Sequence, residues 1–355
     1  MGNVILVDPA EDSCWDSFVE HHPFGLICHL SGWKRVLEKT FGHIKGYYLA
    51  LWDDANNDIR AALPVFEVRS WLTGNRLVSV PFASVCDPLI SSSDEMRTLL
   101  ESALDLSAKL GTSRIEIRTL SSSSFVQDHR FGVSCFYKHH YLLLDGEPEE
   151  LEMTFHRTCV RQRIRRAANS GLDLKVCDSE CDLRRFYQLH LMTRKRLGLP
   201  LQPYAFFQLL WREFASLDRI SLLLAERKGE AIAGLILLKF RDRVSAEFVA
   251  TDASFRDVSP NHFLFWEAIK QAYRQGYNVF DFGRTWSQNI GLMDFKGHWG
   301  TRVVDLPEFH YPRRTSKGTA NREEHTPYRA ARSVCKNAPD NAQALIGSLL
   351  YRHLG

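Results

Sequence analysis

The chain has 355 residues, of which 45% are hydrophobic and 25% charged, a composition typical of a globular protein of about two domains. A formal net charge of +3 excludes a chain-wide nucleic-acid surface, so we expect no DNA partner and at most a local basic face. No window approaches the roughly eighteen apolar residues of a membrane span, and MGNVILVDPAEDSCW lacks the regions of a signal peptide, so we expect a cytoplasmic protein.

Eight cysteines lie scattered along the chain, without a CxxC pair. This usage is typical of reduced thiols in a cytoplasmic protein. Cys177 and Cys181 have CxxxC spacing, but no second Cys or His pair at ligand spacing accompanies them. We therefore predict no metal ion at this pair.

The first half of the chain alternates β-rich runs with helical patterns. Residues 47–52 and 59–68 predict a hairpin, because the turn-forming sequence DDANND joins them. Residues 94–110 have helical periodicity, and Gly111 stops the helix. We also expect strands at 4–7, 114–118 and 136–144, a serine loop at 121–124, and helices from residue 12 or 13 to about 20 and from Ser31 to Gly42.

The second half predicts one helix from about Glu149 to Asn169, stopped at Gly171 and followed by the strand LDLKV. Further helices are expected at 182–197, 204–214 and 262–275, and further strands at 221–225, 231–240, 244–250, 278–282 and 301–311.

Beyond Pro312 the polar sequence RRTSKGTANREEHTP predicts a linker, followed by short helices at 328–336 and 340–354. The last helix has an apolar face at Leu345, Ile346, Leu349 and Leu350. We expect this face to pack on the body or on a partner, and peripheral contact with a membrane surface stays open.

The two halves repeat one order of elements: hairpin strands, a helix ended by glycine, a short strand, then a loop and another strand. We interpret this order as a diverged internal duplication. It predicts a mixed α/β (α+β) fold with two lobes, each a mixed, mainly antiparallel sheet flanked by helices. The predicted domains are residues 1–145, residues 146–312 and a C-terminal segment at 313–355.

The stretch Tyr277–Gly300, YNVFDFGRTWSQNIGLMDFKGHWG, holds the densest set of ionisable groups beside aromatic residues. A short buried strand is expected to end at Gly283. Asp281, Arg284, Asp294, Lys296 and His298 lie in or just beyond that strand. An active site needs charge beside walls that exclude water, and the matching region of the first half is a plain serine loop. The alternative is a solvated loop closed by a structural Asp–Arg pair.

Several blocks of the chain together resemble the FemAB-like transferases, a branch of the GNAT (Gcn5-related acyltransferase) superfamily. They are RIRRAANSGLDLKV, FYQLHLMTRKRLGLPLQPYAFF, SPNHFLFWEAIKQAYRQGY with FDFGRT, and GLMDFKGHWG with the closing VDLPEFHYP. The chain particularly resembles FemAB-related bacterial proteins of exosortase/PEP-CTERM systems, with a BioF2-like acetyltransferase domain. The resemblance implies tandem GNAT-like lobes and transfer of an acyl or aminoacyl group to an amine. The donor would be aminoacyl-tRNA or acyl-CoA, with no permanently bound cofactor.

The resemblance also suggests roles for residues of the second lobe. Lys296 matches the lysine of the family's Phe-Lys motif, where a cation would stabilise the oxyanion that forms as an amine attacks an ester or thioester. Arg284 could hold an anionic group beside Trp286, while Asp281 or Glu247 could accept the amine proton. The neutral alternatives are a solvated Lys296, an Asp281–Arg284 ion pair and an outward-facing Glu247.

Two further regions are candidate substrate contacts. The helix start at Asn261 and His262 stands where GNAT proteins bind the donor's pyrophosphate, but the glycine-rich Q/RxxGxG/A loop of acyl-CoA binding is absent. Arg157, Arg161 and Arg165 recur at i, i+4 and i+8, which predicts one basic helix face. Such a face suits the phosphates of a tRNA, a nucleotide-linked sugar or a polyprenyl-linked acceptor. The alternatives are a helix cap for Asn261 and a solvated helix face for the arginines.

In the first lobe, Trp33 and Lys34 resemble the Trp-containing helix through which Fem enzymes approach their acceptor. Lys34 is therefore a further candidate contact.

These features predict an acyltransferase that forms an amide, by direct attack, on an amine of a cell-envelope or exopolysaccharide precursor. Its expected partners are a lipid- or nucleotide-linked sugar acceptor and, as donor, a tRNA or acyl-CoA. One alternative is an acyl-CoA-dependent N-acetyltransferase of amino sugars. The other is a non-catalytic binding or assembly protein built on the duplicated fold.

Overall fold

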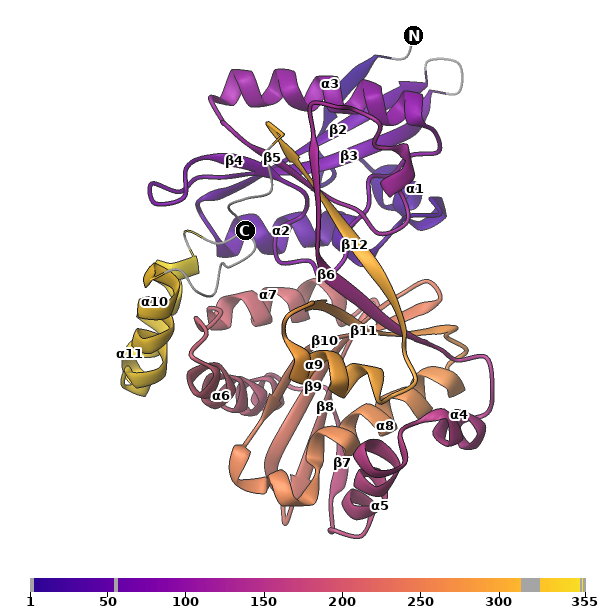
Figure 1. Cartoon of the computed structure of the whole chain (residues 1–355), viewed down its shortest axis with the longest axis vertical. Helices are drawn as coiled ribbons and strands as arrows, with labels where there is room; N and C mark the ends of the chain where they lie inside the picture. The colour runs from indigo at the N-terminus through magenta and orange to yellow at the C-terminus, as the bar shows by residue number, and fades with distance from the viewer. Residues whose placement is uncertain (1–2, 54–56, 314–325, 352, 354–355) are drawn as a thin grey trace. The chain divides into compact units, whose positions relative to one another are not determined.

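The computed structural model of the chain describes residues 3–53, 57–313, 326–351 and 353 (Figure 1). The chain divides into two compact units. Unit 1 comprises Met1–Tyr137, Asp305–Arg322 and Leu349–Gly355, and unit 2 comprises Lys138–Val304 and Glu323–Ser348. The predicted boundary at residue 145 thus falls inside unit 2, and the predicted C-terminal segment is divided between the units.

The sheet of unit 1 contains the predicted hairpin, formed by β2 (Ile44–Asp53) and β3 (Asp58–Val68). Its strand order is β1-β2-β3-β4-β5-β12, with the first part of β6 (Gly132–Leu143) next to β12. The other strands are β1 (Val4–Val7), β4 (Arg76–Val78), β5 (Ile115–Arg118) and β12 (Arg302–Tyr311). β3 and β4 pair antiparallel, whereas β4 and β5 pair parallel.

Unit 1 is covered by α1 (Trp15–His21), α2 (Ser31–Thr40) and α3 (Ser93–Leu110). The third helix confirms the prediction for residues 94–110. The Ser92 side chain caps its start by accepting the Glu95 N–H, and Gly111 ends it with a φ of 64°. Leu99 and Ala103 of this helix pack into the unit's hydrophobic core.

The sheet of unit 2 has the order β6-β11-β10-β9-β8-β7. Its strands are β7 (Asp173–Cys177), β8 (Ile220–Arg227), β9 (Glu230–Phe240), β10 (Arg243–Thr251) and β11 (Val279–Trp286), beside the later part of β6. β7 to β10 form an antiparallel meander. The helix α8 (Pro260–Arg274) then returns the chain so that β11 runs parallel to β10.

The two units share one order of elements. In each, an antiparallel strand pair is followed by a helix and then by a strand parallel to the second of the pair: β3-β4-α3-β5 in unit 1 and β9-β10-α8-β11 in unit 2. This repeated order confirms the predicted duplication and the predicted two-lobed mixed α/β fold.

Helices cover both faces of the unit 2 sheet (Figure 1). On one face, Phe186 of α6 (Glu180–Leu197) lies so close to Gly234 that an added Cβ would approach its ring to 2.7 Å. On the other face, Leu264 of α8 joins a core with Leu223 and Leu235. The remaining helices of the unit's body are α4 (Pro148–Thr154), α5 (Gln162–Ala168), α7 (Tyr204–Phe214) and α9 (Ile290–Gly297).

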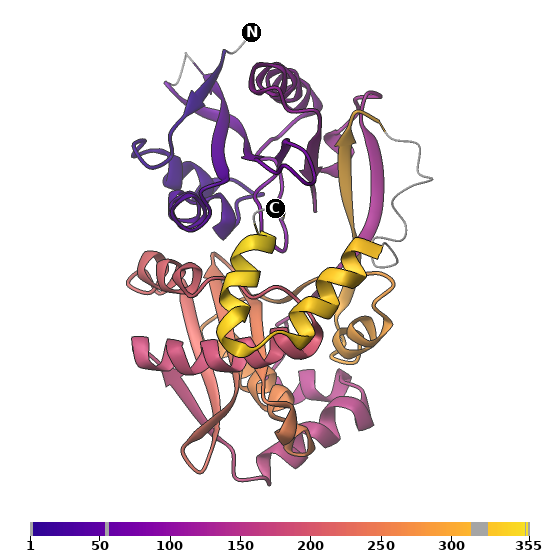
Figure 2. The same ribbon diagram turned by 90° about the vertical axis from the view of Figure 1, so that its left-hand side faces the viewer.

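The C-terminal helices α10 (Thr326–Asn337) and α11 (Asp340–Tyr351) follow the segment predicted as a linker, which lies outside the described residues. α10 packs against α6, as Figure 2 shows, and Arg332 Nε donates to the Leu197 carbonyl at 3.2 Å. On the apolar face predicted for α11, Leu345 and Leu349 are exposed, whereas Ile346 and Leu350 are half-buried. Gly347 faces inward instead, since only a residue without a side chain fits against the Leu201 backbone.

The single helix predicted for residues 149–169 is also wrong. α4 ends at Thr154, a π-helical turn spans Arg157–Arg161, and α5 follows. Phe155 leaves the helix with extended backbone angles (φ −74°, ψ 149°). Its buried ring packs edge-on against Trp266 and Trp299, so core packing overrides the helical pattern here.

The stretch 277–300 contains more regular structure than the sequence predicts. β11 does not end at Gly283 but continues to Trp286, with Gly283 inside it at a φ of 71°. The residues predicted as a loop include α9, whose start is capped by the Asn289 side chain accepting the Leu292 N–H. Lys296 therefore lies on a helix.

Candidate active site

The candidate active site lies in unit 2, at the carboxyl ends of β10 and β11. The parallel register of the two strands ends at the pair Ser245↔Asp281. Beyond it, β10 has an irregularity at Glu247 and β11 passes through the positive φ of Gly283. Such irregularities bend strands, and ligands of open α/β sheets bind beyond the carboxyl ends of parallel strands. The residues around the two bends therefore form the candidate site.

Lys296 is the central cation of this site. It is buried in the last turn of α9, and its Nζ donates to the carbonyl oxygens of Gly283 at 3.0 Å and Arg284 at 3.1 Å. Burial lowers the pKa of Lys296 to about 8, although the charges of Asp281 and Glu247 act to raise it. An ammonium has three N–H donors, so the two backbone bonds use two of them. The ammonium group is thus fixed at the bend of β11.

Asp281 is the buried anion next to this bend. Its Oδ1 accepts from His139 Nε2 at 2.8 Å and from the Gly283 N–H at 2.6 Å, and its Oδ2 accepts from an Arg243 guanidinium nitrogen at 2.8 Å. Burial alone would raise the pKa of Asp281, but His139, Arg243 and the Gly283 N–H hold it well below its ordinary value. The carboxylate therefore stays ionised and orients the Gly283 backbone.

Two adjacent histidines of β6, His139 and His140, also line the candidate site. Neither was among the site residues predicted from the sequence. His140 lies with its Nδ1 3.3 Å from Thr301 Oγ1 and its Nε2 3.3 Å from Met293 Sδ. Burial first, then the charges of Lys296 and His139, lower the pKa of His140 to about 4, so its ring is neutral at pH 7. The only signal in the sequence was the pair of histidines in the β-rich run YKHHY, more than a hundred residues before the site stretch.

Glu247 and Arg284 lie on the two bent strands themselves. The charge of Glu247, which lies at the irregularity of β10, acts to raise the pKa of Lys296. Arg284 is half-buried on β11, and its backbone carbonyl accepts a hydrogen bond from Lys296 Nζ. Trp286 is half-buried at the end of β11, and its carbonyl accepts the Asn289 N–H at 2.8 Å.

Two other ionisable residues of the stretch lie apart from these contacts. Asp294 is exposed on α9, and the ring of His298 packs 4.5 Å from that of His156.

The start of α8 is tied to the end of β10. The Asn261 side chain accepts a hydrogen bond from the Thr251 hydroxyl, and Ser259, not Asn261, is the residue that precedes the helix. The N–H groups of Ser259 and His262 bond to the carbonyls of Arg256 and Ser259, and Pro260 has no N–H. This helix start therefore presents fewer donors to an anion than a usual helix N-terminus.

His262 is held inside the unit. Its ring stacks on Trp299 with centroids 5.8 Å apart and contacts Phe295 edge-on. Burial lowers the pKa of His262 to about 4, so the ring is uncharged at pH 7.

The arginine-rich segment does not form the predicted single helix face. Arg157 begins the π-helical turn, which has more residues per turn than an α-helix, so it loses the expected i, i+4 register. Arg165 is exposed on α5. Arg161 is half-buried, with one guanidinium nitrogen 3.3 Å from Met153 Sδ.

Lys34 belongs to α2 in unit 1. Its Nζ pairs with Glu38 Oε2 at 3.0 Å and Asp8 Oδ1 at 3.3 Å. Trp33, next to it, is buried.

These features define a class of fold. Each half of the chain has a parallel strand pair joined by a crossover helix, and the pair in unit 2 is bent open at its carboxyl end. This is the fold of a tandem GNAT protein. Residues 154–297 match a family model described as an acetyltransferase (GNAT) domain. The fold resembles the crystal structure of FemX, with a TM-score of 0.70, 17% identity, and coverage of 87% of this chain and 97% of that one. It also resembles a tandem GNAT protein from the clavulanic acid biosynthesis pathway, with a TM-score of 0.56, 10% identity, and coverage of 87% and 98%.

Among curated proteins, the chain is 31% identical over 94 residues to a lipid II:glycine glycyltransferase of Staphylococcus epidermidis, covering 24% of this chain and 23% of that protein. It is 31% identical over 101 residues to the Staphylococcus haemolyticus glycyltransferase of the same name, covering 26% and 24%. The alignments thus span about a quarter of these relatives' length. The chain thus contains a match to a GNAT acetyltransferase domain, resembles lipid II:glycine glycyltransferases over a quarter of its length and has a fold similar to that of FemX. No described helix has both the length and the apolar character needed to cross a membrane.

Proposed function

We propose that the chain transfers an acyl or aminoacyl group to an amine of a cell-envelope precursor, with the chemistry at the bend of β10 and β11. The observation that supports this most is Lys296, a buried ammonium held by two backbone carbonyls at that bend. A fixed, desolvated cation there suits an oxyanion that develops during acyl transfer.

In the proposed reaction the acceptor amine attacks the carbonyl carbon of an ester or thioester donor, and the carbonyl electron pair moves to oxygen. Collapse of this oxyanion forms the amide and releases the donor's alcohol or thiol. Lys296 has its third N–H for the oxyanion. Glu247 takes the proton that the amine loses, because the Asp281 carboxylate is already held by three donors. Arg284 and the exposed Arg165 serve anionic parts of the substrates.

Aminoacyl-tRNA is the proposed donor. The N–H groups at the start of α8 are largely used within the chain, which suits a pyrophosphate of coenzyme A poorly. The curated relatives are named as glycyltransferases that act on lipid II. A lipid- or nucleotide-linked precursor carrying an amine is therefore the proposed acceptor, with an exopolysaccharide precursor of exosortase systems as the finer possibility and the cytoplasm as the site of action.

The test begins with native mass spectrometry of the full chain against aminoacyl-tRNA, acetyl-CoA and nucleotide sugars. Selective binding of aminoacyl-tRNA is expected. Binding of acetyl-CoA alone would favour the N-acetyltransferase alternative, and a chain that binds these ligands without forming product would favour the non-catalytic one.

Replacement of Lys296 then tests the chemistry. Lys296→Ala should lower the transfer rate by roughly 10²–10³-fold, since one oxyanion donor is lost. Lys239→Ala is the matched control, because Lys239 is equally buried but lies on β9 and pairs with Asp218. Transfer of a radiolabelled acyl group, with folding checked by circular dichroism, measures both. A folded Lys296→Ala variant with full activity would refute the assignment.

A further inference from the structure

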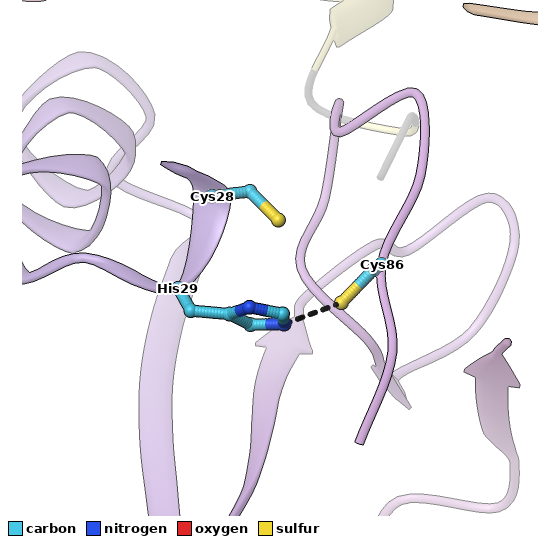
Figure 3. A group of neighbouring side chains, drawn as sticks. All are labelled: Cys28, His29 and Cys86. Carbon is cyan, nitrogen blue, oxygen red and sulfur yellow. Dashed lines mark hydrogen bonds between the residues drawn. The ribbon is translucent and has the colours of Figure 1, made fainter. Parts of the chain in front are cut away.

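Unit 1 contains a cluster of three buried side chains that the proposed function does not use: Cys28, His29 and Cys86 (Figure 3). Cys28 and His29 lie in the 3₁₀ turn Ile27–His29, and Cys86 lies in the segment between β4 and α3. Each is at most 3% exposed, and the two Sγ atoms and a ring nitrogen of His29 lie within 4.8 Å of one another. Such proximity allows either metal binding or thiol chemistry.

The hydrogen bonds of His29 distinguish these two uses. Its Nδ1 accepts the Leu26 backbone N–H at 3.0 Å, so the neutral ring carries its proton on Nε2. Nε2 lies 3.3 Å from Cys86 Sγ and therefore donates to the sulfur. A metal bound at Nε2 would need the proton on Nδ1, where it would face the Leu26 N–H. The cluster is thus arranged for thiol chemistry rather than for a metal ion.

The two thiols have different surroundings. Cys28 Sγ donates to the Val85 carbonyl at 3.5 Å, as a protonated thiol does. Cys86 Sγ lies 3.3 Å from His29 Nε2 and 4.0 Å from the Asp87 carbonyl oxygen, to which it is a weak donor. The neighbouring Cys28 first, and then the His29 ring, hold the pKa of Cys86 well below the ordinary value against the effect of burial. The buried hydroxyl of Tyr48 is a further polar group of unit 1, and burial raises its pKa well above the ordinary value. Within the described residues this hydroxyl has no hydrogen-bond partner.

We propose that Cys86 and Cys28 form a peroxide-reactive dithiol that closes to an internal disulfide. The Cys86 thiolate attacks one oxygen of hydrogen peroxide, the O–O bond breaks, and the departing hydroxide takes a proton to become water. The Cys28 thiol then attacks the resulting Cys86 sulfenic acid, which forms the S–S bond and releases a second water. Peroxide is reduced by two electrons, and the two thiols are oxidised. A dithiol reductant reverses the bond.

The disulfide would affect Asp87, the residue after Cys86, which holds the loop at residues 120–122 in place. The carboxylate of Asp87 accepts the backbone N–H groups of Leu120, Ser121 and Ser122 at 2.8 to 3.1 Å, and the Ser122 hydroxyl at 2.6 Å. Joining Cys86 to Cys28 moves the residue before Asp87, so these amides are expected to exchange faster with solvent in the oxidised protein.

The test treats the reduced full-length chain with limiting hydrogen peroxide, blocks the remaining thiols under denaturing conditions and maps the peptides by mass spectrometry. The expected product joins the Cys28 and Cys86 peptides, and dithiothreitol reverses it. Cys335 is the internal control, because it is equally buried but burial raises its pKa. It should oxidise at least about tenfold more slowly than Cys86. Cys28→Ser should leave a Cys86 sulfenic acid that dimedone traps, and Cys86→Ser should abolish both products.

Three results would overturn the proposal. Cys86 and Cys335 could oxidise at the same rate, or the exposed Cys14 and Cys135 could oxidise while Cys86 stays reduced. Alternatively, elemental analysis could find one zinc or copper ion per purified chain, lost in Cys86→Ser, which would make the cluster a metal site. The wild-type rates and metal content decide the question even where a variant fails to fold.

Discussion

At the scale of single residues, the candidate site depends on two buried charged side chains, those of Asp281 and Lys296, which both hydrogen-bond to the backbone of Gly283. Asp281 holds the N–H of Gly283, and Lys296 holds the carbonyl of the same residue. Lys296 is therefore held by groups of the bend of β11, whereas Asp281 joins that bend to His139 of β6 and Arg243 of β10. The same segment therefore affects both catalysis and local stability. Substitutions of Lys296 and of Asp281 test the two effects separately.

The pKa of Lys296 predicts how activity depends on pH. Its value is about 8 in the folded chain against an ordinary value of 10.5. Above pH 8 the folded chain loses this proton while the unfolded chain keeps it, so the group favours folding increasingly as pH rises towards 10.5. The cation, however, disappears over the same range. We expect kcat/KM to fall above about pH 8 while stability does not fall on account of this group.

A pH–rate profile checks this, with Lys296→Arg as the comparison. The arginine keeps its charge at high pH, so the descending limb should disappear even if the overall rate is lower. If the activity of the wild type and of Lys296→Arg fell at the same high pH, a group other than Lys296 would be responsible for the fall.

Asp281 should contribute mainly to stability. Asp281→Asn leaves His139 and Arg243 without their buried anion, so we expect a loss of about 3–5 kcal/mol in the free energy of unfolding. Because the folded pKa of Asp281 is depressed, its contribution is present at neutral pH and is lost as pH falls through that depressed value. Urea unfolding at pH 7 measures the loss.

The control for this measurement is Asp94→Asn, which breaks an ion pair with Arg97 at a site where the Asp94 side chain is 81% exposed. It should leave stability unchanged within error. Equal effects of the two substitutions would show that the Asp281 contacts contribute nothing specific.

At the scale of secondary-structure elements, sequence patterns predict the local structure well. The β2–β3 hairpin, α3 with its Gly111 stop and the meander of unit 2 all follow from turn residues and periodicity. The predictions are wrong where contacts with residues far away in the sequence determine the local structure. The helix breaks at Phe155 because Trp266 and Trp299 bind its ring, more than a hundred residues away.

The candidate site shows the same limit. Lys296, Arg284 and Glu247 could be selected from the sequence because they lie in or beside one dense stretch and its neighbouring strand. His139 and Arg243 could not, since pairing of β6 and β10 with β11 brings them to Asp281.

Gly283 gives an element-scale prediction. Its φ of 71° lies in the left-handed region, so Gly283→Ala should cost about 1–2 kcal/mol of stability. It should also lower transfer activity more than this loss implies, because the carbonyls that hold Lys296 would move. Urea unfolding and the transfer assay measure the two effects.

The comparison variant is Gly291→Ala in α9, where an added Cβ meets no atom within 4 Å. Alanine favours helix there, so this variant should be as stable as the wild type or up to about 1 kcal/mol more stable. If Gly283→Ala behaves like Gly291→Ala, the bend of β11 does not depend on glycine.

At the scale of the whole molecule, each unit has its own core but neither is one continuous piece of chain. In unit 1, β12 pairs with β5 from Glu308↔Arg118 to Tyr311↔Ile115. Phe309 enters the core of that unit, although the residues come from the far end of the sequence. Sequence periodicity cannot show this, because it reports on neighbours along the chain.

The fragment 1–145, the first domain predicted from the sequence, should therefore not fold alone. It lacks β12, so β5 would have an open edge, the core would lose Phe309, and Arg118 would lose Glu308, 3.4 Å away. We expect poor dispersion in its NMR spectrum and no cooperative unfolding. The same fragment joined through a glycine–serine linker to residues 302–313 should regain both. A well-dispersed spectrum from 1–145 alone would show that unit 1 is complete without β12, and equal disorder in both fragments would show that β12 is not what it lacks.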